Sequence, residues 1–336
     1  MIYYILLYII FIFILNLYIK KNNIIKSYTG SVHQTFANLT VPLVGGIYIL
    51  IPVVFFYFND FKILLFFYIL FFILGLFSDL NILHSAKKRF FLQIIILILF
   101  VYLSKLEITS TRIYLLDIMI NNIFLSYFFT LFCLIVLING SNFIDGLNSL
   151  LLIYLIIIFF FLLKLDLINS INSINQKEFS LVLVLLFIVL MNFFNQLFLG
   201  DSGAYSLSFL TGVILINIYN FNQQISPFFI ILLLWYPCFE NLFSIFRKII
   251  SKKNPLKPDN EHLHYHLYIY FINKFSFTKL KSNNISSILI NLVNFVIFYF
   301  ASKNIYHTGY QVSIITVSII FYCSVFYILK KRNFNI

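Results

Sequence analysis

The stretch Asn139-Gly-Ser-Asn-Phe-Ile-Asp-Gly-Leu-Asn-Ser-Leu150 separates two of the most apolar runs in the chain, residues 124–138 and 150–163. Its amides and its carboxylate recur every third residue, at Asn139, Asn142, Asp145 and Asn148. A helix over this stretch would carry them along one face. One aspartate in the middle of a membrane costs roughly 2.5–3.5 kcal/mol on insertion scales. The pattern therefore favours a wet, polar site where a membrane segment ends, and a plain polar loop between two spans is the alternative.

The composition places the chain in a membrane. Of its 336 residues, 62% are hydrophobic and only 10% are charged, which is more apolar sequence than a soluble core needs. We expect an all-α, polytopic bundle of about 11 transmembrane helices that forms one domain over residues 1–336. The apolar runs of spanning length are residues 2–18, 43–58, 61–77, 90–104, 123–138, 150–165, 179–198, 204–220, 227–246, 285–302 and 310–329.

The first of these runs is interpreted as a retained transmembrane helix and not as a signal peptide. No basic residue precedes it and no small-residue cleavage site follows it. The three cysteines, Cys133, Cys238 and Cys323, lie singly in apolar runs. Their spacing supports neither a disulfide framework nor a cysteine metal site.

Lysine and arginine are unequally distributed between alternate loops. The richer set is Lys20, Lys21, Lys26, Lys87, Lys88, Arg89, Arg247, Lys248, Lys252, Lys253, Lys257, Lys274, Lys279, Lys281, Lys330, Lys331 and Arg332. The poorer set is Lys62, Lys105, Arg112, Lys164, Lys177 and Lys303. By the positive-inside rule the richer loops are cytoplasmic, which places the N-terminus outside and the C-terminus inside. The net charge of +12 is then explained by topology and the anionic lipid surface, and no nucleic-acid partner is expected.

Five cytoplasmic stretches hold the residues suited to chemistry, within loops at about residues 19–42, 78–89, 139–149, 199–203 and 247–284. They are Pro42-Leu-Val-Gly-Gly46 after His33-Gln34; Ser78-Asp79 with Lys87, Lys88, Arg89 and Gln93 following; Asn139–Leu150; Leu199-Gly-Asp-Ser-Gly203; and Asp259-Asn-Glu-His-Leu-His-Tyr-His266. The glycines of the first stretch are expected to let the backbone approach a ligand. A helix starting near Asp201 would offer free N–H groups to a phosphate.

Carboxylates converging on one membrane face, ringed by cations, indicate a site for anionic substrates. Because the carboxylates and an anionic substrate repel each other, a divalent cation is needed between them. Mg²⁺ binds one or two carboxylates plus phosphate oxygens. Asp201 is the best candidate ligand because Gly200 and Gly203 let the backbone bend where a span ends.

The five stretches, in this order, resemble the polyprenyl-phosphate N-acetylhexosamine-1-phosphate transferases, over roughly residues 30 to 270. The Asp259–His266 loop is similar to that of the branch that initiates O-antigen and enterobacterial common antigen with GlcNAc 1-phosphate. The resemblance implies transfer of an N-acetylhexosamine 1-phosphate from a UDP-sugar to undecaprenyl phosphate, with UMP released and Mg²⁺ (or Mn²⁺ in its place) required. It also implies the bacterial inner membrane, an active site facing the cytoplasm, a place in cell-envelope polysaccharide synthesis, and a second copy of the chain as a partner to test for.

The same resemblance assigns roles to individual residues. Asp79 and Asp145 match catalytic positions, and Asp201 matches the metal-binding aspartate. Substrate-binding roles fall to Asn139, Asn142, Lys87, Arg247, His262 and His264. Three positions depart from the family pattern: Ser78 and Asn148 replace acids, and Tyr265 replaces a histidine. The first two weaken the negative charge available for Mg²⁺ or for proton removal.

Two other functions are compatible with parts of this pattern. A transporter or flippase for lipid-linked sugars would need ionisable residues near mid-span, where Glu240 is the one candidate, and would often show a hydropathy repeat, which is not seen. A zinc site would need His262, His264 and His266 aligned on an extended strand. The identity of the sugar, and direct displacement against a two-step route, are left open by the sequence.

Overall fold

The computed structural model describes residues 2–22, 24, 41–57, 61–167, 175–255 and 260–334; His33, Gln34 and Asp259 lie outside these ranges. The described residues are all-helical, as predicted, and form fourteen helices. The helices are α1 (Ile2–Lys21), α3 (Gly45–Tyr57), α4 (Lys62–Asp79), α5 (Ala86–Ser104), α6 (Tyr114–Ile120), α7 (Ile123–Ile144), α8 (Leu150–Lys164), α9 (Asn175–Phe193), α10 (Gly200–Phe221), α11 (Pro227–Leu233), α12 (Trp235–Ile250), α13 (Leu263–Phe275), α14 (Lys279–Ala301) and α15 (Thr308–Phe334).

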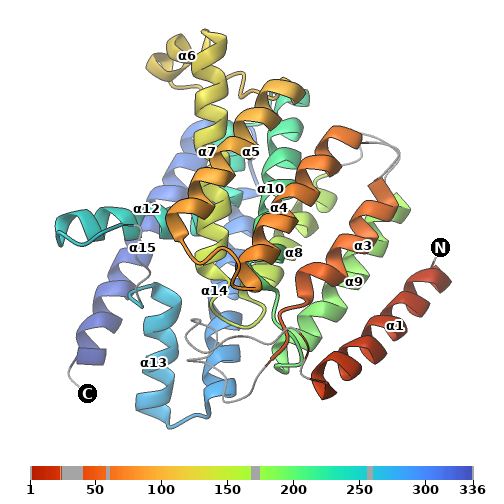
Figure 1. The fold of residues 1–336 in the computed structure, drawn as a ribbon. Helices are drawn as coiled ribbons and strands as arrows, with labels where there is room; N and C mark the ends of the chain where they lie inside the picture. The colour runs from red at the N-terminus through yellow and green to blue at the C-terminus, as the bar shows by residue number, and fades with distance from the viewer. Residues whose placement is uncertain are drawn as a thin grey trace.

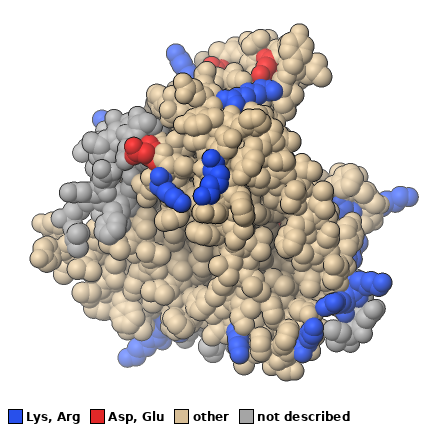
Figure 2. Space-filling view, turned by 180° about the vertical axis from the view of Figure 1, so that it is seen from behind, with Lys and Arg blue, Asp and Glu red and all other residues tan. Residues whose placement is uncertain are grey.

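The helices form a multi-pass membrane bundle. Six of those described are long and apolar enough to cross a membrane, or seven if α11 and α12 count as one bent span. Helices α3 and α8 and residues 181–193 of α9 are shorter apolar helices. Large hydrophobic side chains are exposed along much of the surface, as expected where lipid is the solvent. The face in Figure 2 shows few charged side chains, mostly toward its edges. Eleven spans and the orientation remain predictions.

Helix α10 is the centre of the bundle, packed against α3, α4 and α7 (Figure 1). Small residues let these backbones come close. A Cβ on Gly75 of α4 would overlap the backbone of Ser202, and one on Gly46 of α3 would lie 2.5 Å from the Gly203 nitrogen. Without water in the bilayer core, such close packing of small residues is a main source of helix association.

The two glycines of the Pro42–Gly46 segment serve this packing. Gly45 N–H donates to the Phe198 carbonyl at 2.9 Å, and Gly46 N–H donates to the Leu199 carbonyl at 3.0 Å. We expected their lack of side chains to admit a ligand. In the structure they admit another part of the chain, which fixes the segment that precedes α10.

The loops gather at the two ends of the bundle, one marked by α6 and the other by α13 (Figure 1). At the α13 end, Lys20 Nζ donates to Gln196 Oε1 at 2.8 Å, and Lys330 Nζ donates to Glu261 Oε2 at 2.7 Å. At the α6 end, the Arg112 guanidinium donates to the carbonyls of Tyr306 and of Gln223, Gln224 and Ile225. The contacts thus join loops of the predicted cytoplasmic set to one another, and loops of the other set to one another.

The structure differs locally from three interpretations of the sequence. Helix α7 ends at Ile144, so residues 139–150 are not one continuous helix. The predicted span 227–246 is broken at Leu234, where α11 and α12 meet at a bend of 76° and α12 points away from the bundle axis (Figure 1). Residues 263–266 begin helix α13, so the three histidines do not share an extended strand.

Candidate active site

Asp201 lies at the centre of a polar cluster at the α13 end of the bundle. It occupies the first turn of α10, directly after Gly200, whose φ of +80° favours glycine. Its Oδ2 accepts hydrogen bonds from Arg89 Nη1 at 2.9 Å and Ser78 Oγ at 2.5 Å. Its Oδ1 accepts one from Asn142 Nδ2 at 2.6 Å. Helices α4, α5, α7 and α10 therefore all contribute to its environment.

Asp79 caps the N-terminus of α10, next to Asp201. Its carboxylate accepts the backbone N–H of Asp201 at 2.8 Å and that of Ser202 at 3.0 Å. A Cβ on Gly200 would lie 2.6 Å from Asp79 Oδ2, which is a second reason for glycine there. We expected free N–H groups at the start of α10 to meet a substrate phosphate. These two N–H groups are instead bonded to Asp79, which also stabilises the positive end of the helix dipole.

Asp145 is the third carboxylate, placed directly after α7. It is 7% exposed, and no hydrogen-bond donor contacts its carboxylate within the described residues. Burial, followed by the nearby charges of Asp201 and Asp79, raises the pKa of Asp145 well above its usual range. Among the described residues, Arg89 is the one cation shown bonded to these three acids, and it bonds to Asp201, so the cluster has an excess of negative charge.

The donor set fits a divalent cation completed by phosphate oxygens. Asp201 and Asp145 offer carboxylate oxygens, the ligands that Mg²⁺ prefers. The oxygens of Asp201 are bonded only to side chains, whereas those of Asp79 are bonded to the backbone of α10. In the described part of the chain, no group of three or more His, Cys, Asp or Glu is arranged to hold a metal ion by itself. The arrangement is that of a cation bound by one or two carboxylates and the substrate, and not of a closed protein cage. Neither does it provide the zinc site considered for the histidines.

The remaining amides of the central stretch lie further from the carboxylates. Asn139 Nδ2 donates to Gln93 Oε1 at 3.0 Å and to the Ile135 carbonyl, which joins α7 to α5. Asn148 Nδ2 donates to Asn195 Oδ1 at 2.6 Å, and Asn148 N–H donates to Asn283 Oδ1 at 2.7 Å. Because α7 ends at Ile144, Asn148 is turned away from the acids and holds the turn that follows.

Two histidines lie against the other side of the same helix end. The rings of His262 and His264 stack at 5.4 Å with an interplanar angle of 7°, and the His262 ring is 5.3 Å from that of Phe143. A Cβ on Gly146 would be 3.0 Å from His264 Nε2. The end of α7 therefore lies between Asp201, which contacts Asn142, and the two histidines, which contact Phe143 and Gly146. Burial, with the neighbouring His262, lowers the pKa of His264 to about 3, so this imidazole is neutral.

The two predicted cationic site residues have different surroundings. Lys87 is exposed, and the structure shows no partner for its side chain among the described residues. Arg89, and not Lys87, contacts the acids. Arg89 and Gln93 lie four residues apart on the face of α5 that is directed toward the bundle, and Ser85 caps this helix. Arg247 lies in α12, where Nη1 donates to the Glu261 carbonyl and Nε is 3.6 Å from Glu261 Oε2. It holds the segment that leads to His262.

Comparison with known proteins supports the interpretation of the carboxylate cluster. The model of glycosyl transferase family 4 matches residues 61–219. This range contains all three acids and Arg89, but neither the histidines nor Arg247. Among curated proteins, none matches the chain. The part of the chain that builds the carboxylate cluster is therefore similar to glycosyl transferase family 4, a family of polyprenyl-phosphate sugar-1-phosphate transferases.

Proposed function

We propose that the protein transfers an N-acetylhexosamine 1-phosphate from a UDP-sugar to undecaprenyl phosphate and releases UMP. The observation that supports this most is the cluster of Asp79, Asp145 and Asp201 at one end of a membrane bundle. At such an end a water-soluble nucleotide sugar and the phosphate of a membrane lipid can meet. The family match over residues 61–219 supplies the reaction class.

The residues of the cluster have complementary tasks in this reaction. Arg89 and Asn142 hold the two oxygens of Asp201 in fixed directions. Mg²⁺ bound by Asp201 would neutralise diphosphate charge and favour the departure of UMP. A carboxylate whose pKa is raised, as that of Asp145 is, suits the removal of a proton from the lipid phosphate.

The finer assignment concerns the donor. His262 and His264 lie beside Phe143 and Gly146, immediately next to Asp145. A UDP-sugar bound over this loop would have its diphosphate near the acids, and the free ring nitrogen of a neutral imidazole can accept a hydrogen bond from a hydroxyl of the donor. This favours the branch that starts O-antigen or enterobacterial common antigen, with GlcNAc as the first sugar to test. The site would face the cytoplasm of a bacterial inner membrane, where nucleotide sugars are available.

The carboxylate cluster does not favour a transporter of lipid-linked sugars. Its three acids lie at helix ends and not along a central pathway. Glu240, the acid considered for such a pathway, is bonded to His262 and Tyr322.

The test is a transfer assay with two labels in the donor. Membranes containing the protein are given undecaprenyl phosphate, Mg²⁺ and UDP-N-acetylhexosamines with ³²P in the β-phosphate and ³H in uridine. The expected result is ³²P in the lipid and ³H in UMP. Release of UDP, or no labelled lipid with any donor in membranes that contain folded protein, would contradict the proposal. Membranes with the Asp201→Asn variant serve as the control.

A further inference from the structure

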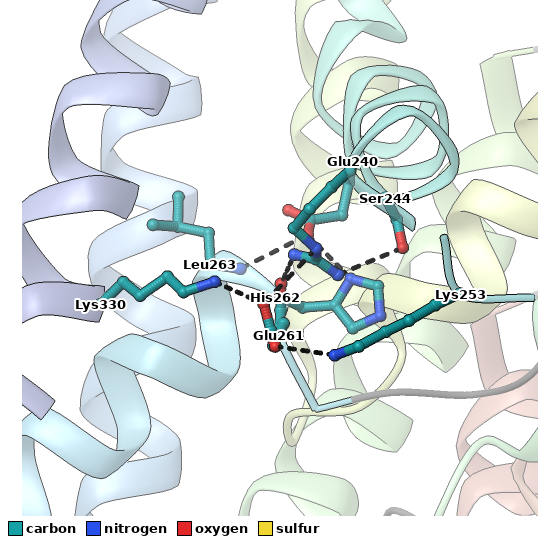
Figure 3. A network of polar contacts seen from close by, with 8 residues as sticks. Glu240, Ser244, Lys253, Glu261, His262, Leu263 and Lys330 are labelled. Atoms are coloured by element: carbon teal, nitrogen blue, oxygen red, sulfur yellow. Dashed lines mark hydrogen bonds and ion pairs between the residues drawn. The ribbon is translucent and has the colours of Figure 1, made fainter. Parts of the chain in front are cut away.

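Glu240 is a buried acid that the proposed chemistry does not use. It lies in α12 and is 0% exposed. A buried carboxylate is costly unless it has partners, and its two oxygens have separate ones. Oε1 accepts from His262 Nδ1 at 2.9 Å and from the Leu263 N–H at 3.4 Å, and Oε2 accepts from Tyr322 OH at 2.6 Å. Figure 3 shows the contacts of Glu240 with His262 and Leu263, between α12 and the start of α13.

The partners of Glu240 determine the state of His262. A carboxylate only accepts hydrogen bonds, so the Nδ1 of His262 carries the proton and its Nε2 is directed away from Glu240. The ring is further held by its stacking on His264 at 5.4 Å and its contact with Phe143 at 5.3 Å. Carboxylates that bond to one nitrogen of a functional histidine in this way fix its tautomer and its orientation.

The neighbouring side chains keep Glu240 and Tyr322 rigid. The Tyr322 ring contacts Phe239 at 5.0 Å and Phe243 at 5.5 Å, both from α12. The charged groups nearest to this segment are engaged elsewhere: Glu261 Oε2 pairs with Lys330 at 2.7 Å and with Arg247 Nε at 3.6 Å. The bond to His262 is therefore made by Glu240 and not by the adjacent Glu261.

We propose that Glu240, oriented by Tyr322, is a positioning residue that holds His262 in the Nδ1–H tautomer for binding of the UDP-sugar. This inference rests on the proposed function. It assigns to α12 and α15, which lie outside the matched family segment, a role in donor recognition. The bend between α11 and α12 sets the direction of α12 and so the position of Glu240. Glu240 in turn holds His262.

The first test is a double-mutant cycle between Glu240→Gln and His262→Ala. Each single variant should lower kcat/KM for the UDP-sugar about tenfold, the lower end of what is typical when the carboxylate partner of a functional histidine is removed. The KM for lipid phosphate should stay near that of the unmodified protein. The double variant should be no worse than His262→Ala alone, because Glu240 acts through His262. Losses that multiply, or that fall equally on the lipid substrate, would overturn the inference.

Two further variants control for loosening of the structure. Glu261→Gln changes the adjacent acid, keeps its shape, and should leave donor kinetics within about twofold of normal, as expected for a surface ion pair. Tyr322→Phe removes one hydrogen bond to Glu240 among aromatic neighbours that accept Phe. It should reproduce part of the Glu240→Gln loss, which keeps the test available if Glu240→Gln does not fold. Normal donor kinetics in Tyr322→Phe would refute the role of Tyr322.

A spectroscopic measurement separates this inference from the proposed function. ¹⁵N NMR of histidine-labelled protein should show an Nδ1–H histidine that disappears in His262→Ala and changes in Glu240→Gln. An unchanged His262 signal in Glu240→Gln would overturn the positioning role even if the enzyme is active. A changed signal in a protein without transferase activity for any donor would instead contradict the proposed function alone.

Discussion

The Asp79 carboxylate accepts the backbone N–H of Asp201 at 2.8 Å, so the acid that ends α4 caps the helix that the second acid begins. A structural and a chemical role are thus combined in Asp79, and substitutions can separate them. Asn retains an oxygen that can accept an N–H, whereas Ala retains none. We expect Asp79→Ala to lower the free energy of unfolding by about 0.5–2 kcal/mol and Asp79→Asn to change it much less.

Turnover should respond differently from stability in these two variants. Asp79→Asn removes a negative charge beside Asp201, so its transferase rate should fall even though its melting temperature is near normal. Thermal unfolding in detergent and the transfer assay measure the two effects. A fully active Asp79→Asn would show that this acid only caps α10.

Asp201→Asn should abolish most activity. The substitution keeps the hydrogen bond from Asn142 but removes the charge that pairs with Arg89 and that would bind Mg²⁺. Loss of one electrostatic stabiliser of this kind typically costs at least about 10²-fold in rate. The measurement is kcat at several Mg²⁺ concentrations. Near-normal turnover with unchanged Mg²⁺ dependence would place the metal elsewhere.

Arg89 and Lys87 form a matched pair for the cationic role. Arg89→Ala removes the cation bonded to Asp201 in the described part of the chain and should lower kcat/KM by about tenfold or more, as loss of a partly buried charge partner does. Lys87→Ala removes an exposed lysine two residues away and should change kcat/KM by less than about twofold. Equal losses in the two variants would indicate a general effect of positive charge on this surface.

His264 should make stability depend on pH in the acid range. Burial lowers its pKa from 6.5 to about 3. Between these values the unfolded chain binds a proton that the folded chain does not, so stability decreases as the pH falls from 6.5 toward 3. The slope is at most about 1.4 kcal/mol per pH unit for one group. In thermal unfolding against pH, His264→Gln should flatten this slope. An unchanged slope in this variant would show that another group causes the pH dependence.

The orientation can be tested by labelling single cysteines in a cysteine-free chain. Asn260→Cys, at the α13 end, should resist an impermeant thiol reagent added to intact cells. Lys303→Cys, at the α6 end, should react. The prediction follows from the excess of lysine and arginine in the loops that gather around α13. The reverse result would place the carboxylates on the wrong side for a cytoplasmic nucleotide sugar.

The sequence was sufficient for the features that depend on local pattern. The apolar runs predicted an all-helical membrane bundle, and the Gly-Asp-Ser-Gly motif predicted a helix that starts near Asp201. The sequence was insufficient where a side chain's surroundings depend on which face of a helix is buried, or on a partner far away in the chain. Arg89, and not Lys87, faces Asp201 because it lies one turn before the buried Gln93, on the face of α5 that packs against the bundle. The bond between Glu240 and Tyr322 joins residues 82 positions apart, and no spacing along the chain indicates it.

The end of α7 has a consequence for how this protein can vary. Asn142 faces Asp201, whereas Phe143, the next residue, faces His262. One inserted or deleted residue before this point would rotate everything beyond it by about 100° and exchange the two sets of neighbours. Length changes here should therefore be eliminated by selection even when every side chain is retained. Insertions between helices at the α6 end, far from both sets, should be tolerated.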